Sequence, residues 1–197
     1  YEVSGGVLHV SLGDVMGKGT GAALIGAATR TALRSTSSAV SAGVDLGVTV
    51  THVARSMLDD LERAESFVTL IDLALDLESG IARYVDAGSG LLLLVRADGT
   101  PVRLSGRDRP LGILPDDHWE EVEVELRTGD RLVLFSDGVL DLLEDPDDWP
   151  RAVGSWVAEA DDLPSFLTAM ARTATEETPL DDITVVAVFR QGVKEIG

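Results

Sequence analysis

The sequence predicts an α+β domain in which helices and antiparallel strands occupy separate stretches of the chain. Two helical segments follow the first strand, a run of strands follows them, and two further helices precede a closing strand. Such segregation is typical of α+β architecture rather than of alternating βαβ units. Short turns such as Ala97–Asp98–Gly99 join successive strands, which favours antiparallel hairpins over crossover connections.

The helices are predicted from periodicity and composition. After a cluster of glycines, the chain becomes rich in Ala and Leu, which predicts a helix from near Gly19 to Arg34. In residues 45–61, apolar side chains recur at helical spacing, as in Val53, Met57 and Leu61. Two more helices are expected over residues 149–159 and 164–175.

The strands are predicted from short apolar runs bounded by turn residues. Residues 120–126 alternate acidic and aliphatic side chains, which predicts a half-exposed strand, whereas residues 7–12 read as a buried one. The expected strands cover residues 7–12, 67–77, 81–87, 90–96, 101–104, 120–126, 131–135 and 183–189.

Length and composition limit the class of protein. The 197 residues fit one compact domain, residues 1–197, and 45% of them are hydrophobic, enough for a sizeable core. A net charge of −18 argues against binding to nucleic acid or to an anionic membrane. The absence of cysteine excludes disulfides and thiolate chemistry. Because the chain begins at Tyr1 without an initiator Met, we expect an N-terminally truncated fragment, and a further upstream domain is compatible with it.

Three acidic motifs lie where predicted strands begin or end. Asp14 comes just past the first strand, Asp137 comes just past the strand 131–135, and Asp181–Asp182 precedes the closing strand. Converging carboxylates repel one another, so such a cluster is stable at neutral pH mainly with a cation bound. Oxygen ligands select hard ions such as Mg²⁺, Mn²⁺ or Ca²⁺.

Other readings of these motifs stay open. Asp-Asp pairs also begin at Asp59, Asp116, Asp147 and Asp161, and Asp-Gly after a strand is a common turn, so one motif alone is weak. The segment Gly17–Lys18–Gly19 lacks the Ser or Thr and the first Gly of a phosphate-binding loop. The three histidines, His9, His52 and His118, have no metal-ligand spacing, and we expect them to be structural or exposed.

The motifs together resemble a known family. These are Gly13-Asp14-Val15-Met16-Gly17-Lys18-Gly19, Tyr84-Val85-Asp86-Ala87-Gly88, Pro110-Leu111-Gly112-Ile113, residues 128–138 around Phe135-Ser136-Asp137-Gly138, and Asp181-Asp182-Ile183-Thr184. In this order they resemble the stage II sporulation protein E-type bacterial serine phosphatases, a branch of the metal-dependent (type 2C) protein phosphatases.

The resemblance implies a four-layer α-β-β-α sandwich with two facing antiparallel sheets and two Mn²⁺ or Mg²⁺ ions at one end. Asp14 would bridge the ions, the carbonyl of Val15 would bind one, and Asp137 and Asp181 would complete the protein ligands. Asp182 falls at a neighbouring polar position and would support them. A water between the two ions would attack the phosphate, so that Asp14, Asp137 and Asp181 act through it.

Two departures from the family pattern stand out. The family has a further acid in a Gly-Gly-Asp-aromatic-Tyr segment, and Tyr1–Glu2 looks like the tail of that segment. A chain that truly began at Tyr1 would therefore bind metal more weakly. Eukaryotic relatives carry a His two residues after the bridging Asp, where this chain has Met16, so protonation of the leaving group is left to another source.

The function implied is hydrolysis of phosphoserine or phosphothreonine on a regulatory protein, for which the resemblance suggests a phosphorylated anti-sigma-factor antagonist. The alternatives are a catalytically weak or inactive signalling module that binds a partner protein, and a small-molecule phosphomonoesterase. Intact Asp14, Asp137 and Asp181 argue against the inactive module. We expect a cytoplasmic location, with no membrane contact by this domain, and a homodimer stays open.

Overall fold

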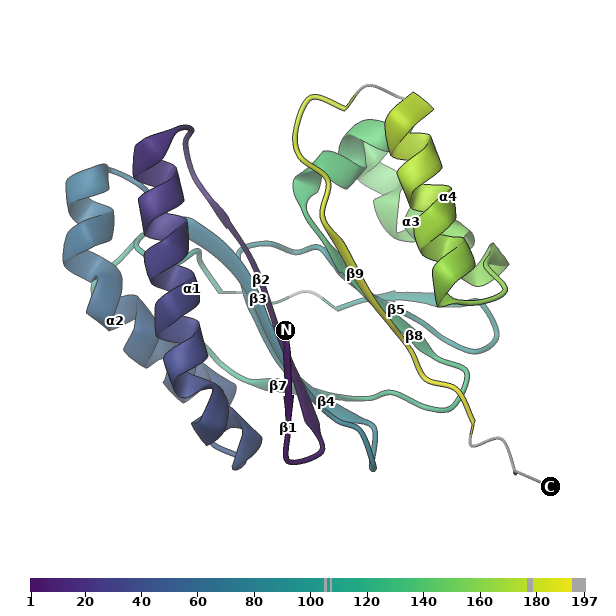
Figure 1. The fold of residues 1–197 in the computed structure, drawn as a ribbon, viewed down its shortest axis with the longest axis horizontal. Coiled ribbons are helices and arrows are strands. Elements are labelled where there is room, and N and C mark those ends of the chain that lie inside the picture. The colour runs from purple at the N-terminus through teal and green to yellow at the C-terminus, as the bar shows by residue number, and fades with distance from the viewer. Residues whose placement is uncertain (105, 107, 177–178, 193–197) are drawn as a thin grey trace. The chain divides into compact units, whose positions relative to one another are not determined.

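The computed structural model describes residues 1–104, 106, 108–176 and 179–192. The chain divides into two compact units, one made of Tyr1–Gly90 with Ser105–Glu125 and the other of Leu91–Leu104 with Leu126–Gly197. Each unit contains one antiparallel sheet and one pair of α-helices (Figure 1). The prediction of one domain over residues 1–197 stays a prediction.

The first unit is built on a five-stranded sheet with the order β1-β2-β3-β4-β7, and every neighbouring pair is antiparallel. The hairpin between β1 and β2 turns at Gly5 and Gly6, whose φ angles of 57° and 80° favour glycine. The strands are β1 (Glu2–Ser4), β2 (Val7–Val15), β3 (Val68–Asp76), β4 (Ile81–Ala87) and β7 (Val122–Glu125).

Helices α1 (Thr20–Ser41) and α2 (Leu46–Ala64) pack on one face of this sheet (Figure 1). Their apolar faces share a core with β3 and β4, in which Leu46 and Leu61 are almost fully buried. Burying a leucine side chain contributes roughly 1.5–3 kcal/mol. Helix α2 starts at Asp45, whose carboxylate accepts the Val48 N–H at 2.9 Å as an N-terminal cap.

The second unit carries a four-stranded antiparallel sheet with the order β6-β5-β8-β9. Helices α3 and α4 pack on one face of it, where Phe135 and Trp149 meet edge to face with ring centroids 5.2 Å apart. The elements are β5 (Leu92–Val95), β6 (Pro101–Arg103), β8 (Arg131–Phe135), β9 (Val185–Phe189), α3 (Trp149–Glu159), α4 (Leu163–Glu176) and two 3₁₀ helices, η1 (Asp137–Leu142) and η2 (Pro146–Asp148).

The α+β class is confirmed, because both sheets are antiparallel and each unit carries its own helix pair. These sheets and helix pairs are the layers that the expected sandwich requires, while the facing of the two sheets stays a prediction. No helix among the described residues is long and apolar enough to cross a membrane.

Two predictions about the first strand were wrong. Strand β2 continues to Val15 because it pairs with β3 along its whole length, from Val7 opposite Asp76 to Val15 opposite Val68. Asp14 therefore lies inside the strand, near its end, and not past it. The strand is also mostly half-buried or exposed, and only His9 and Val10 are buried.

Candidate active site

Asp14 is held in the first unit by the last paired residues of β2. It lies opposite Thr69 of β3, and the next residue, Val15, lies opposite Val68. The pairing extends one step further, since Met16 N–H donates to the Phe67 carbonyl at 2.9 Å. Asp14 is exposed to solvent on this fixed strand end, so its carboxylate is accessible to a hydrated cation.

The chain leaves β2 through a glycine-rich turn before α1 begins at Thr20. Gly17 and Gly19 have φ angles of 107° and 82°, in the region that favours glycine. Lys18 between them is exposed. No side chain caps the start of α1 at Gly19.

Asp137 opens helix η1 directly after β8, and the preceding Ser136 connects it to the segment before β9. The Ser136 hydroxyl donates to the Asp182 carbonyl at 3.0 Å and accepts the Thr184 N–H at 2.9 Å. The Ser136 N–H also donates to the Thr184 carbonyl at 3.0 Å. These three hydrogen bonds fix Asp182 beside the strand end that carries Asp137.

The same segment lies close to η1, as the packing at Gly138 and one hydrogen bond to Asp141 show. A β-carbon on Gly138 would lie 2.6 Å from the Asp182 carbonyl oxygen and 3.0 Å from that of Asp181, so only glycine fits. At the other end, Asp141 accepts the Leu180 N–H at 2.9 Å. Asp141 of η1 therefore holds the segment before Asp181, and Ser136 holds it at Asp182 and Thr184.

The acids of the second unit are available for a metal. Asp137, Asp181 and Asp182 are all exposed, and Asp181 Oδ1 accepts the Asp182 N–H at 2.8 Å. This hydrogen bond orients the Asp181 carboxylate and leaves its second oxygen as a further acceptor. Exposed carboxylates and backbone carbonyls are the oxygen donors that Mg²⁺ and Mn²⁺ prefer, so the donor chemistry fits these ions.

The four predicted acids are divided between the units, with Asp14 in the first and Asp137, Asp181 and Asp182 in the second. Within either unit, the described residues form no cluster of three or more His, Asp or Glu side chains that could hold a metal ion. A shared metal site would have to be formed by both units together, and the convergence of these acids stays a prediction.

Sequence reasoning gave no role to Ser136 or Asp141, and it took Asp86 only as part of a motif. Asp86 is 2% exposed, and its carboxylate accepts the N–H groups of Ser89, Gly90 and Gly106 at 2.9–3.0 Å. It thus ties the turn after β4 to the start of the segment 106–121. The signal in the sequence was only an acid placed before Ala87-Gly88.

An ion pair shapes the same segment. Arg109 donates from Nε and Nη2 to the Asp117 carboxylate at 3.2 and 2.5 Å. The hydrogen bond from Arg109 lowers the pKa of Asp117, which is buried, below its ordinary value. Trp119 Nε1–H donates to the Arg109 carbonyl at 2.8 Å, so the pair is fixed from both sides.

The three histidines are buried or exposed, as the sequence predicted. His52 and His118 are exposed, on α2 and in an acidic loop. His9 is buried, and its Nε2 lies 2.9 Å from Asp72 Oδ1. This buried pair was not predicted, because the two residues are 63 positions apart.

Comparison with protein-family models decides the family. Residues 4–191 match the model described as stage II sporulation protein E (SpoIIE). The chain belongs to the SpoIIE family. The match spans both units and confirms the resemblance read from the motifs. A comparison with curated proteins found no match.

Solved structures show the same fold. The RsbU and RsbW domains of Rv1364c from Mycobacterium tuberculosis are 25% identical to the chain, with a TM-score of 0.78 over 95% of this chain and 52% of that one. The SpoIIE-family chain thus spans about half the length of that relative. RsbX in complex with magnesium is 16% identical, with a TM-score of 0.73 over 94% of this chain and 82% of that one.

A third structure carries the family's name. The PP2C phosphatase domain of SpoIIE from Bacillus subtilis, solved with a fragment of its regulatory domain, is 20% identical, with a TM-score of 0.71. The match covers 98% of this chain and 59% of the solved chain. The predicted enzyme class, a metal-dependent phosphoprotein phosphatase, is confirmed at the level of the family.

Proposed function

We propose that this chain is a metal-dependent protein serine/threonine phosphatase that removes phosphate from phosphoserine or phosphothreonine on a regulatory protein. One observation in the structure supports it most strongly. Helix η1 and Ser136 hold the Asp181–Asp182 segment beside Asp137, so two of the predicted metal-binding acids come from adjacent, rigid parts of one unit.

The chain's own carboxylates and one backbone carbonyl would hold the metal ions. Asp14, Asp137 and Asp181 would hold two Mn²⁺ or Mg²⁺ ions through carboxylate oxygens, with the Val15 carbonyl as a further donor and Asp182 in support. When bound, such ions lower the pKa of water and neutralise charge on a phosphoryl group. The structure of RsbX with magnesium supports divalent-metal binding in this fold.

Residue 16 bears on the fate of the leaving group. Met16 cannot donate a proton, and the exposed Lys18 lies outside the predicted ligand set. A serine alkoxide that leaves the phosphate would therefore take its proton from solvent or from water held at the site. If water supplies this proton, substitution of Lys18 should leave turnover unchanged.

For the substrate, we propose a phosphorylated anti-sigma-factor antagonist, with a cytoplasmic location and the capacity to form a homodimer. Support comes from the family match and from the relative that carries RsbU and RsbW domains. The inactive signalling module is not favoured, because Asp14, Asp137 and Asp181 are all retained.

The test is hydrolysis of p-nitrophenyl phosphate and of a phosphoserine protein, with Mn²⁺ and with excess EDTA. We expect turnover only with Mn²⁺, and a loss of more than about a hundredfold in Asp137→Asn, which corresponds to ~3 kcal/mol of transition-state stabilisation. Asp161→Asn is the matched control, because Asp161 is an exposed acid of the same unit. Equal rates with Mn²⁺ and with EDTA would contradict the proposal.

A further inference from the structure

A cavity of about 560 Å³ lies within the first unit, between helix α1 and strands β1 and β2. Its volume falls in the range of roughly 300–1,000 Å³ that small-molecule sites occupy. Every residue that borders it comes from Tyr1–Gly90, and of the predicted metal-binding residues only Val15 is among them. The family assignment and the proposed phosphatase chemistry leave this cavity without a role.

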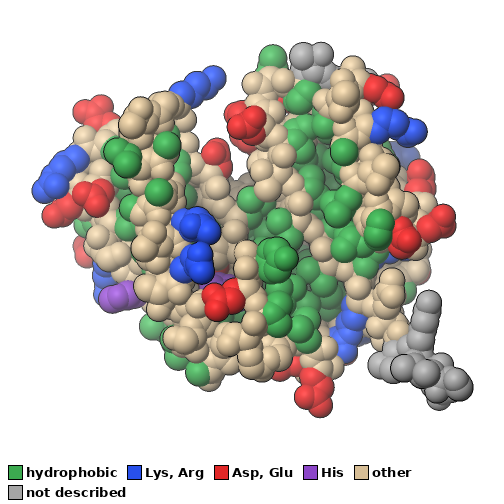
Figure 2. Space-filling view, in the orientation of Figure 1, with side chains coloured by type: hydrophobic (Ala, Val, Ile, Leu, Met, Phe, Trp, Pro, Cys, Tyr) green, Lys and Arg blue, Asp and Glu red, His purple; other side chains and the backbone are tan. Residues whose placement is uncertain are grey.

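One wall of the cavity is a basic face of α1. Arg30 and Arg34 are one helical turn apart and both border the cavity, so their guanidinium groups lie along the same side of the helix. Figure 2 shows basic side chains grouped on the side of α1 that borders β1 and β2. Glu2 of β1 also borders the cavity, so two exposed arginines are opposed by one exposed carboxylate in the lining. In a chain with 34 acidic and only 16 basic residues, this excess of positive charge in the lining favours an anionic ligand.

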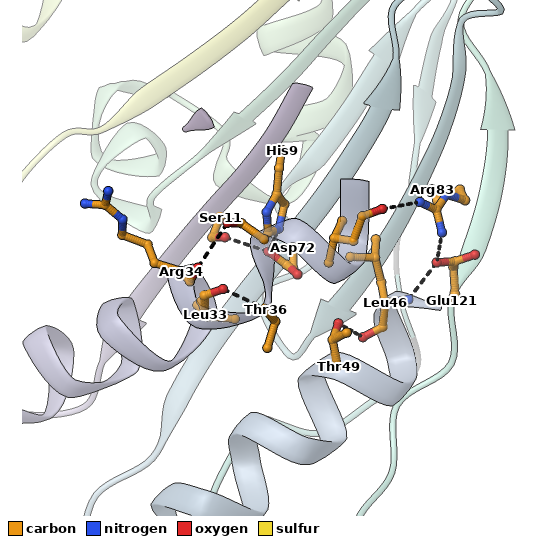
Figure 3. A network of polar contacts seen from close by, with 12 residues as sticks. His9, Ser11, Leu33, Arg34, Thr36, Leu46, Thr49, Asp72, Arg83 and Glu121 are labelled. Atoms are coloured by element: carbon orange, nitrogen blue, oxygen red, sulfur yellow. Dashed lines mark hydrogen bonds and ion pairs between the residues drawn. The ribbon is translucent and has the colours of Figure 1, made fainter. Parts of the chain in front are cut away.

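The floor of the cavity carries a polar cluster. His9 and Ser11 border the cavity and converge on Asp72 of β3 (Figure 3). His9 Nε2 lies 2.9 Å from Asp72 Oδ1, and the Ser11 hydroxyl donates to the same oxygen at 2.6 Å. Both side chains that border the cavity thus meet at one oxygen of a buried carboxylate.

Asp72 has unused hydrogen-bonding capacity in this cluster. It is fully buried, and its Oδ2 has no hydrogen-bond partner among the described residues. An unpaired carboxylate oxygen in a protein interior is costly, and such groups call for a specific explanation. A donor group that entered the floor of the cavity would offset this cost after a small rotation of the carboxylate.

Apolar side chains complete the lining. Leu33 of α1 and Val68 and Leu70 of β3 border the cavity beside the polar groups. Small residues on α1, Gly26 and Ser37, leave the space open. We propose that this cavity binds a small organic anion with an apolar body and an N–H or O–H donor, its anionic group against Arg30 and Arg34 and its donor toward His9, Ser11 and Asp72.

The cavity touches the strand end that carries Asp14. Gly13 and Val15 both border it, and they flank Asp14 in β2. Since side chains alternate along a strand, Asp14 points to the opposite face of the sheet. A bound molecule would therefore contact the backbone that presents Asp14. This consequence rests on the proposed function, whereas binding to the cavity does not.

Anilinonaphthalene sulfonate is a suitable probe, because it combines a sulfonate, a flat apolar ring system and an N–H donor. Fluorescence titration of the full chain should give saturable binding. In Arg30→Gln/Arg34→Gln the dissociation constant should rise at least ~10-fold, since both cations are lost. Ser37→Phe should also weaken binding, because its ring would occupy part of the cavity beside Arg34.

Arg55→Gln is the matched control, since Arg55 is an exposed arginine on α2 that does not border the cavity. It should bind the probe as the unchanged chain does. Circular dichroism and a cooperative urea transition establish that each variant is folded, and if Ser37→Phe does not fold, the double arginine variant decides. Unsaturable binding, or equal affinity in the double variant and in Arg55→Gln, would overturn the proposal.

Discussion

The hydroxyl of Ser136 donates a hydrogen bond to the backbone carbonyl of Asp182 at 3.0 Å, although the two residues are 46 positions apart. Because Ser136 directly precedes Asp137, this contact sets how the Asp181–Asp182 segment lies against the end of β8. The same hydroxyl accepts the Thr184 N–H, so one side chain connects the end of β8, next to Asp137, with the segment before β9 that contains Asp181 and Asp182.

Ser136→Ala should weaken both stability and metal binding. It removes two hydrogen bonds, each with a net contribution of about 1 kcal/mol, and leaves the Thr184 N–H without its partner. We expect the free energy of unfolding in urea to fall by roughly 1–2 kcal/mol and the Mn²⁺ dissociation constant to rise in calorimetric titration. Ser136→Thr keeps the hydroxyl and should restore both. A Ser136→Ala variant with unchanged Mn²⁺ affinity would show that the contact does not position the ligands.

Gly138→Ala should displace the same segment from the other side. The added β-carbon would lie 2.6 Å from the Asp182 carbonyl oxygen, and backbone must shift to relieve that contact. Overpacking of this kind costs roughly 1–3 kcal/mol. Gly21→Ala, in α1 with nothing within 4 Å of the added carbon, is the control and should not destabilise the chain. The measurement is the melting temperature of both variants, and equal values would refute the close packing.

Single and double substitutions of the buried His9–Asp72 pair should have very different effects on the free energy of unfolding. His9→Leu leaves the Asp72 carboxylate buried with one fewer donor, which should cost about 3 kcal/mol or more. In His9→Leu/Asp72→Leu no buried charge remains, so the double variant should be more stable than the single one. A urea double-mutant cycle measures the coupling. Additive effects would show that the pair does not interact.

The Arg109–Asp117 pair predicts a dependence of stability on pH. Because the pKa of Asp117 is lowered in the folded state, its ionisation stabilises the fold above the unfolded value of about 3.9. That contribution is lost as the pH falls through the lowered folded value. Asp117→Asn should therefore be less stable than the unchanged chain at neutral pH, and the difference should shrink below about pH 4.

Asp116→Asn, at the exposed neighbouring position, is the control for this pH series. Its stability should follow that of the unchanged chain across the whole range in urea unfolding. A difference for Asp117→Asn that persists undiminished at pH 2 would show that its cause is packing rather than charge.

The sequence predicted the bounds of a helix or strand correctly where signals within that segment determine them. Strand β8 and helix α3 have the bounds that were predicted, Arg131–Phe135 and Trp149–Glu159. The first is an apolar run between turns, and the second has Pro150 in its first turn, where proline is tolerated. Helix α1, in contrast, runs seven residues beyond its predicted end at Arg34, to Ser41.

That extension could not be read from propensity, because residues 35–41 are rich in Ser and Thr. Their hydroxyls donate to carbonyls of the preceding turn, as Thr36 does to Leu33 at 2.8 Å, and Val40 is fully buried in the core of the unit. Tertiary packing thus overrides a weak local preference. The His9–Asp72 pair and the Ser136–Asp182 contact were missed for a related reason, since each joins residues 46 or more positions apart.

We propose that Asp14 and Asp137 bind the same divalent-metal centre. Calorimetric titration of Mn²⁺ into Asp14→Asn, Asp137→Asn and the double variant tests it directly, with Asp161→Asn as the control. We expect each single variant to lose at least ~10-fold in affinity and the double variant to lose less than the two free-energy changes added together, because both residues would act on the same bound metal. Full Mn²⁺ affinity in Asp14→Asn, or strictly additive losses in the double variant, would contradict it.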